Sequence, residues 1–273
     1  MAAKFLNQAE NDPSPAAGDA TIFRILGETS VATAEAGAVA IHGKKAELLS
    51  FLLLNANKVI PVDQIVETLW DDEPPKSAIR NVRTYVWQIR RVLGTQAHRL
   101  NQVAGGYVFH CDPEELDVSR FEELRLAGYQ SLEAADSETA AEKFREALAL
   151  WRGDVLNGVR LSHRLQAVTD WLRDRRLGVF ESLMEADLAL GRHQDVAEHA
   201  SREVINHPFR ERLYEVAMRA QLGLGRPSEA LAVYRKAQQV FAKELGIRPG
   251  AALDDIYRQI VRGRPGDSPA TQP

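Results

Sequence analysis

The segment R-N-V-R-T-Y-V-W-Q-I-R-R, residues 80–91, indicates an amphipathic helix with an unusual outer face. The helix is predicted from about Ser77 to Leu93, because apolar residues recur there at spacings of 3 and 4. Its predicted buried stripe comprises Ile79, Val82, Val86, Ile89 and Leu93. The quoted segment also holds four arginines, one tryptophan and no carboxylate. Its positive charge therefore has no partner on the helix itself.

Positive charge is concentrated around this helix, although the whole chain has a net charge of −4. From Pro74 to Cys111 there is no Asp or Glu, and the same window holds six Lys or Arg residues. The window from Asp112 to Leu150 carries eleven acidic and four basic residues. A basic window without carboxylates is locally unfavourable unless a bound anion neutralises its charge, and nucleic acid is the usual anion. A solvated basic face is the alternative, and the charge pattern alone leaves both open.

The outer face of the predicted helix offers side chains suited to a DNA major groove. Guanidinium groups suit phosphates or guanine edges, and hydroxyl or amide groups suit bases. We expect DNA contacts from Arg80, Arg83, Thr84, Trp87, Gln88, Arg90 and Arg91. For Trp87 two interpretations stand: it packs on a sugar-phosphate backbone or partner protein, or it packs within this chain.

The flanking segments predict a winged helix. Short β-prone runs from Thr21 onward predict antiparallel strands. Two helices, at about Lys44 to Asn57 and Val62 to Trp70, precede the basic helix, as a helix-turn-helix requires. Behind it, two β-prone runs flank Ala104-Gly105-Gly106, which predicts a hairpin, or wing. Expected contacts from the wing are Arg99, Asn101 and Tyr107.

The second half of the chain has the pattern of helical repeats. M-E-A-D-L-A-L-G-R at 184–192 and M-R-A-Q-L-G-L-G-R at 218–226 share six of nine residues at an offset of 34. Thirty-four residues is the period of tetratricopeptide repeats, in which each repeat is a helix pair. A long helix from about Leu165 to Leu190 is expected to add apolar residues to this core, namely Val168, Trp171, Leu172, Phe180 and Leu183.

Both halves resemble one known family. P-V-D-Q-I-V-E-T-L-W, N-V-R-T-Y-V-W-Q-I-R-R-V-L-G and A-G-G-Y-V-F resemble the OmpR-type winged helix of the Streptomyces antibiotic regulatory proteins (the SARP family). L-D-V-S-R-F-E-E-L, H-P-F-R-E-R-L and E-L-G-I-R-P-G resemble that family's bacterial transcriptional activation domain. The resemblance covers about residues 21–262. The expected fold class is mainly α with a small β component, a winged helix followed by an all-α repeat domain similar to tetratricopeptide repeats.

The resemblance implies a transcriptional activator that binds promoter direct repeats on double-stranded DNA and recruits RNA polymerase, for an antibiotic or other secondary-metabolite gene cluster. A second copy is an expected partner on the DNA. The resemblance implies that Trp70 contacts a phosphate, or else closes the helix pair as a core residue. It also implies that an acidic loop faces polymerase, unless that loop is simply a solvent-exposed turn. The loop residues concerned are Asp71, Asp72, Glu73 and Lys76.

The expected domain organisation follows from these patterns. It comprises a disordered segment 1–20, a winged helix 21–111, a repeat-type activation domain 112–262 and a disordered tail 263–273. The chain is expected to be a small stand-alone member or the front part of a larger regulator. One cysteine excludes an intrachain disulfide.

Catalytic and metal-binding motifs are not found in the sequence. Seven histidines are scattered without metal spacing, and no phosphate-binding loop is complete. We therefore expect no cofactor, no metal, no enzymatic activity and a cytoplasmic, nucleoid-associated protein without a membrane segment. The competing function is a helical-repeat interaction scaffold whose basic domain binds an acidic protein.

Overall fold

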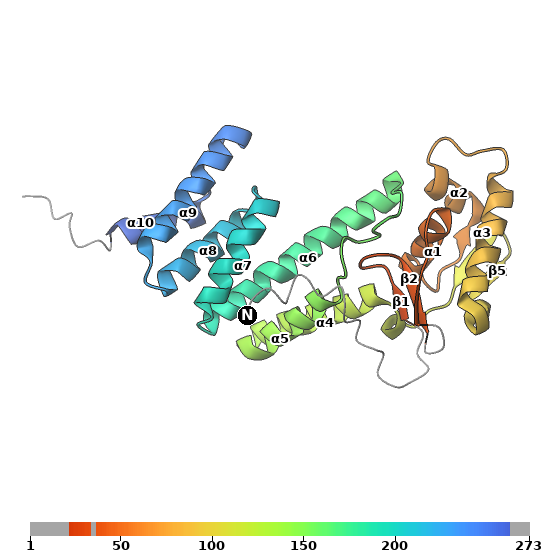
Figure 1. The fold of residues 1–273 in the computed structure, drawn as a ribbon, viewed down its shortest axis with the longest axis horizontal. Helices are drawn as coiled ribbons and strands as arrows, with labels where there is room; N and C mark the ends of the chain where they lie inside the picture. Colours follow the sequence, from red (N-terminus) through yellow and green to blue (C-terminus); the bar gives the residue numbers. More distant parts are fainter. Residues whose placement is uncertain (1–21, 34–36, 263–273) are drawn as a thin grey trace, which may run out of the picture. The chain divides into compact units, whose positions relative to one another are not determined.

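The computed structural model describes residues 22–33 and 37–262 (Figure 1). The described residues form two compact units. One contains those up to Leu126 together with Glu146–Arg176, and the other contains Ala127–Arg145 and residues 177–262. The predicted domain boundary between residues 111 and 112 falls inside the first of these compact units and stays a prediction. The disorder predicted for residues 1–20 and 263–273 falls outside the described residues and stays a prediction.

The first unit begins with an antiparallel three-stranded sheet. Its strands are β1, Ile22–Arg24, β2, Ser30–Thr33, and β3, Gly37–Ala40, in that order. Val31 pairs with Phe23 on β1 and with Val39 on β3. Phe23 and Val31 are buried, so the predicted β-prone runs do form strands that contribute to the core.

Three helices follow, as the periodicity predicts. They are α1, Lys44–Leu54, α2, Val62–Trp70, and α3, Ala78–Leu93. A second antiparallel sheet has the order β4, Ile60–Pro61, then β6, Gly106–Phe109, then β5, Leu100–Val103. Strands β5 and β6 are the predicted wing. A Cβ on Gly106 would lie 2.3 Å from the Ile60 carbonyl oxygen, so only glycine allows β6 this close to β4.

A buried carboxylate joins the N-terminal sheet to the helices within the first unit. Asp117 is the first residue of α4, Asp117–Glu133, and its side chain is 3% exposed. It accepts hydrogen bonds from the backbone N–H groups of Ile25 and Leu26 at 3.0 Å, and Arg152 donates to it at 2.7 Å. Burial raises the pKa of Asp117, while Arg152 and the two amides act in the opposite direction.

Backbone hydrogen bonds reinforce this junction. The loop after α5, Ser137–Ala149, donates from Arg152 N to Leu26 O at 2.9 Å and from Leu156 N to Ile25 O at 3.0 Å. The segment after β1 is therefore held by residues more than a hundred positions later in the chain. This arrangement explains why residues 146–176 belong to the same compact unit as the winged helix.

The second unit contains the repeat. Its second segment begins within α6, His163–Ala189. Four helices follow: α7, His193–Asn206, α8, Glu211–Gly223, α9, Pro227–Val240, and α10, Ala251–Arg262. A short π-helix, η3, Phe241–Leu245, lies between α9 and α10. Helices α7 and α9 begin and end at the same 34-residue offset. Gly191 and Gly225 have φ of 74° and 70°, which ends each preceding helix in the left-handed region.

Of the five apolar residues predicted for the long helix, Leu172 and Leu183 are buried, and Val168 and Phe180 are half-buried. Ala230, Tyr234, Ala237 and Phe241 are all buried. Trp171 is 47% exposed, which contradicts the prediction that it joins the core, because its neighbour Leu172 takes the buried position on α6. Arg175 lies over the Trp171 ring, with its guanidinium carbon 4.2 Å from the centroid.

Asp117→Asn should destabilise the chain strongly. The amide would present an N–H donor toward backbone donors and leave Arg152 without its counter-charge. We expect a loss of about 3–5 kcal/mol in the free energy of unfolding, measured by urea denaturation. The exposed Asp63→Asn serves as the control, within about 0.5 kcal/mol of the parent. Equal effects of the two substitutions would contradict the structural role of Asp117.

Candidate nucleic-acid interface

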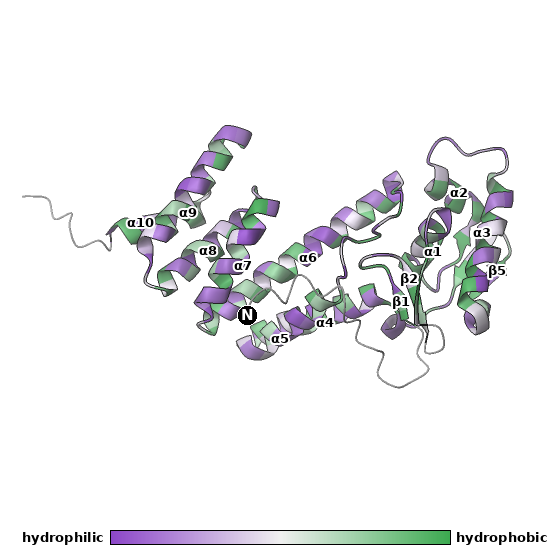
Figure 2. Cartoon of the chain, in the orientation of Figure 1, coloured by the Kyte–Doolittle hydropathy of each residue, from purple (hydrophilic) through white to green (hydrophobic). Residues whose placement is uncertain are grey.

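Helix α3 has one buried side and one exposed side. The buried residues are Ala78, Val82, Val86, Ile89 and Leu93. Figure 2 shows both hydrophobic and hydrophilic turns along α3. The helix ends at Leu93, and the following Gly94 has a positive φ of 55°, which glycine adopts without steric cost. Ser77 occupies the N-cap position but makes no capping hydrogen bond through its side chain, which instead accepts from Asn81 Nδ2 at 3.2 Å.

The helical spacing predicts a buried Ile79, and the structure contradicts this prediction. It is 50% exposed, whereas Ala78 is 6% exposed and takes the buried position in the first turn. The reason is that the 3-and-4 spacing fits either residue, and only the packing of the unit selects between them. The first turn of α3 thus presents a large aliphatic side chain to solvent.

Two arginines near the start of α3 are free to meet an anion. Arg80 and Arg83 are exposed, and neither is paired with a carboxylate among residues 22–33 and 37–262. Thr84 is also exposed, and its hydroxyl donates to the Arg80 carbonyl at 3.1 Å. Gln88 is half-buried one turn further on. These four residues share the outer half of α3, as predicted.

Trp87 lies on the exposed side of α3, at 55% exposure. The Arg91 guanidinium carbon lies 4.9 Å from its ring centroid. Such a cation–π pair holds a flat aromatic surface and a positive charge together on the helix. The interpretation that Trp87 packs on the wing or elsewhere within the chain is not supported at this degree of exposure.

Arg90, in contrast, is used inside the protein. Its Nε and Nη2 atoms donate to the Leu100 carbonyl at 3.0 and 2.8 Å, which ties the end of α3 to the first strand of the wing. The prediction placed Arg90 among the DNA contacts. Its guanidinium is half-buried against β5, because the wing begins directly beside the last turn of the helix.

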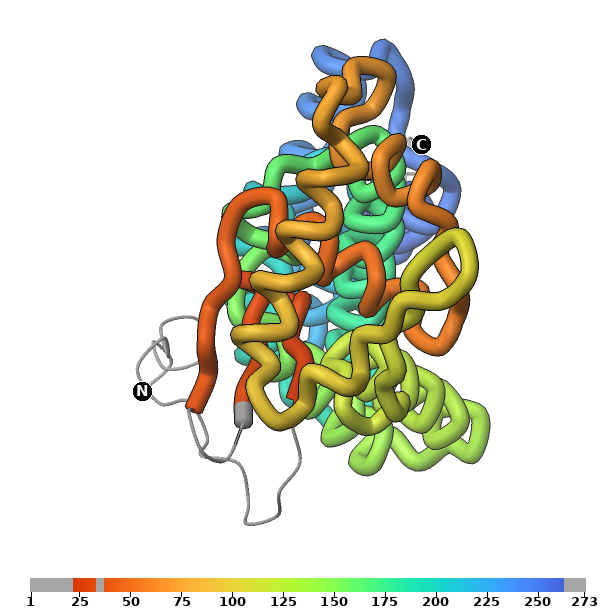
Figure 3. Tube along the Cα trace, turned by 90° about the vertical axis from the view of Figure 1, so that its right-hand side faces the viewer, coloured from red at the N-terminus to blue at the C-terminus, as the bar shows by residue number. Residues whose placement is uncertain are grey.

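Figure 3 shows α3 and the β5–β6 hairpin facing the same side of the first unit. The predicted wing contacts have different surroundings. Asn101 is half-buried, and its amide donates to the His98 carbonyl at 2.9 Å. Gln102, which the sequence reasoning missed, is exposed on β5. Alternation along the strand is the signal that distinguishes the two neighbours.

Two further wing predictions need correction. Tyr107 is 3% exposed, because it lies on the central strand of the small sheet opposite Ile60. Arg99 donates through both terminal nitrogens to the carboxylate of Glu115 at 2.6 Å, and its side chain is 18% exposed. Glu115 lies just outside the acid-free window, so composition could not reveal this pair. Tyr107 is therefore a core residue, and the Arg99 guanidinium is paired within the protein.

Trp70 packs between helices. Its ring stacks on Tyr85 of α3 with centroids 6.3 Å apart, and the Lys44 ammonium lies 5.8 Å from its centroid. It is half-buried. This packing supports the alternative in which Trp70 closes the pair of helices α2 and α3, and a phosphate contact at its exposed edge stays a prediction.

The acidic loop between α2 and α3 is partly held by the start of α6. Asp71 has φ of 52°, and its carboxylate accepts a hydrogen bond from the His163 backbone N–H at 3.1 Å. Arg164 pairs with Glu67 at 3.2 Å beside it. Asp71 is thus turned inward as a helix cap. The other predicted loop residues, Asp72, Glu73 and Lys76, are exposed.

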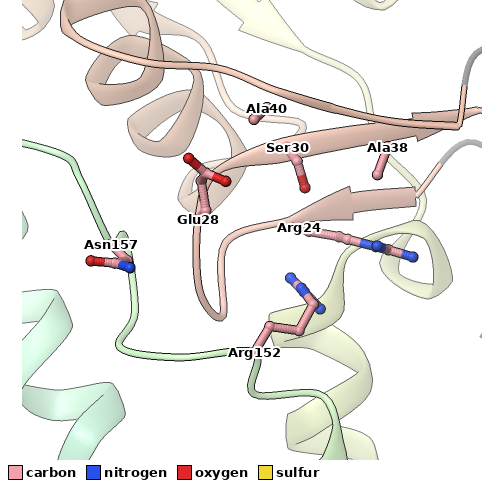
Figure 4. A pocket seen from close by; sticks show the side chains of 7 residues that line it. All are labelled: Arg24, Glu28, Ser30, Ala38, Ala40, Arg152 and Asn157. Atoms are coloured by element: carbon pink, nitrogen blue, oxygen red, sulfur yellow. The ribbon is translucent and has the colours of Figure 1, made fainter. Parts of the chain in front are cut away.

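A hollow beside β1 and β2 carries no functional assignment. Figure 4 shows Arg152 pointing from its loop toward the sheet, with Arg24, Glu28 and Asn157 around the same hollow. Arg152 is already paired with Asp117, so its charge is neutralised there. Within the described ranges no cluster of metal-ligating side chains occurs, and no helix there has the length and apolarity to cross a membrane.

Two family models match the chain. Residues 36–109 match the C-terminal domain of transcriptional regulatory proteins, and residues 116–261 match the bacterial transcriptional activator domain. The first match spans α1 to α3 and the wing. The second begins one residue before Asp117 and continues into α10.

Individual relatives match over both regions. Regulatory protein DnrI of Streptomyces peucetius is 36% identical, over 83% of this chain and 86% of DnrI. Regulatory protein AfsR of Streptomyces griseus is 30% identical over 94% of this chain, which covers only 26% of AfsR. A solved structure of Mycobacterium tuberculosis EmbR in complex with a low-affinity phosphopeptide has a TM-score of 0.83 at 28% identity, covering 90% of this chain and 66% of that one.

Arg90→Ala and Arg83→Ala should differ in their effect on stability. The first removes two charge-assisted hydrogen bonds to a carbonyl, so we expect a loss of about 1–3 kcal/mol in urea unfolding. The second removes an exposed, unpaired side chain and should stay within about 0.5 kcal/mol of the parent. A smaller loss for Arg90 than for Arg83 would show that the bond to Leu100 does not stabilise the wing.

Proposed function

The chain belongs to the SARP family of transcriptional regulators, and on that premise we propose that it is a DNA-binding activator of a secondary-metabolite gene cluster. In this proposal the winged helix binds direct repeats at a promoter, with α3 in the major groove and the wing on the adjacent backbone. The helical region holds a second copy of the chain, RNA polymerase, or both.

The observation that carries the proposal is the unpaired positive charge on α3. Arg80 and Arg83 are exposed and have no carboxylate partner among the described residues, and Arg91 is held beside Trp87. Phosphates supply the missing negative charge, and displaced counterions make binding depend strongly on salt. Arg90 and Arg99 are left out of this set, because their guanidinium groups are engaged inside the fold.

Base recognition is assigned to the centre of the same helix. Thr84 and Gln88 offer a hydroxyl and an amide on the outer half of α3, and one arginine is available for a guanine edge. Trp87 with Arg91 is proposed to lie along the sugar-phosphate backbone. On the wing, the exposed Gln102 and the half-buried Asn101 are the polar side chains proposed to contact DNA.

Polymerase contact is proposed for the exposed part of the loop between α2 and α3. Asp72 and Glu73 are available there, whereas Asp71 is turned toward α6. The competing proposal, a scaffold that binds an acidic protein, uses the same arginines. It differs in requiring no affinity for duplex DNA.

Arg80→Ala and Arg83→Ala should each weaken binding to random-sequence duplexes. Each should also make the slope of log affinity against log salt less negative by about one unit, because one phosphate contact contributes about −0.9 to that slope. Fluorescence anisotropy over a salt series measures both. The exposed Arg235→Ala, on α9, is the control and should leave the slope unchanged. No measurable duplex affinity at low salt would reject DNA binding and favour the acidic-protein scaffold.

Reversing Asp72 and Glu73 to lysine should abolish activation in a reconstituted transcription assay. DNA affinity should stay equal or rise, because the change adds positive charge near the duplex. Reversing the exposed Glu114 and Glu142 alters the net charge equally and should leave activation intact. Loss of DNA binding in the loop variant would instead assign the loop to folding or to DNA contact.

A further inference from the structure

Helix α3 carries a continuous row of four exposed side chains. Ile79, Arg83, Trp87 and Arg91 follow one another at spacings of four residues, and all four are exposed. Residues four apart are neighbours on a helix surface, so the row alternates aliphatic, cationic, aromatic and cationic groups. Within the row, Trp87 and Arg91 touch. Ile79 stands at the N-terminal end of the row.

Ile79 is exposed at the N-terminal end of the helix proposed to enter the major groove. A single exposed isoleucine on a protein surface is ordinary and needs no partner. This one is 50% exposed at the start of a helix whose next exposed residues, Arg80 and Arg83, have no carboxylate among the described residues. In helix-turn-helix proteins the N-terminal residues of this helix contact base edges. An aliphatic group is therefore held where bases are read.

The major groove offers one apolar group, the 5-methyl group of thymine. We propose that Ile79 contacts a thymine methyl group in the operator and so selects thymine at that position. The inference rests on the proposed function, because it requires α3 to enter the groove. The positive charge of Arg80 and Arg83 favours duplex DNA over an apolar protein surface as the occupant of this face.

The test uses a duplex selected from a random pool by the full chain. Each thymine is replaced singly by uracil, which removes only the methyl group and keeps the base pair. For the parent chain, at least one replacement should lower affinity by about threefold to fivefold, the effect of one buried methyl group. For Ile79→Ala, the same replacement should have no effect. Ile79→Val, which keeps a branched side chain, should retain most of the discrimination.

Control variants separate the possible outcomes. The exposed Val59→Ala, outside α3, should keep the uracil effect. Thr84→Ser tests whether the methyl group of Thr84, also exposed on α3, is responsible instead. If duplex binding occurs but no replacement distinguishes Ile79→Ala from the parent, the thymine contact is rejected and the proposed function stands. If the parent selects no duplex, both fail, and an apolar protein partner for Ile79 becomes the explanation.

Discussion

The architecture of the first unit depends on the buried carboxyl group of Asp117. It lies in the interior, where a lone charge would be strongly unfavourable, and three donors surround it: two backbone amides after β1 and the Arg152 guanidinium. These donors come from widely separated parts of the chain. Only the folded unit brings them together, so the N-terminal sheet, the start of α4 and the loop after α5 must form as one structure.

Five arginines of the first unit differ in their partners. Arg90, Arg99 and Arg152 are bonded to a carbonyl, a carboxylate and the buried Asp117, and they set the geometry of the wing and the junction. Arg80 and Arg83 have no such partner among the described residues and remain available to an external anion. The same residue type thus stabilises the fold where it has a partner inside the protein, and forms a basic surface where it has none.

The same separation appears in the loop between α2 and α3. Asp71 is bound to the first turn of α6, whereas Asp72 and Glu73 are free in solvent. A helix N-terminus carries partial positive charge, so Asp71 both stabilises α6 and positions the loop that follows it. The proposed polymerase surface is therefore placed by the helical part of the first unit as well as by the winged helix.

Local patterns in the sequence determined the bounds of α2, the periodicity of α3, the wing hairpin and the 34-residue repeat. Each depends on residues a few positions apart, whose spacing and turn chemistry are visible without a fold. Tertiary structure alone decided that Ile79 faces outward, that Tyr107 faces inward, and that Arg99 is paired with Glu115. The physical reason is that helical spacing allows more than one buried stripe, and a charge is free or neutralised according to neighbours that only folding supplies.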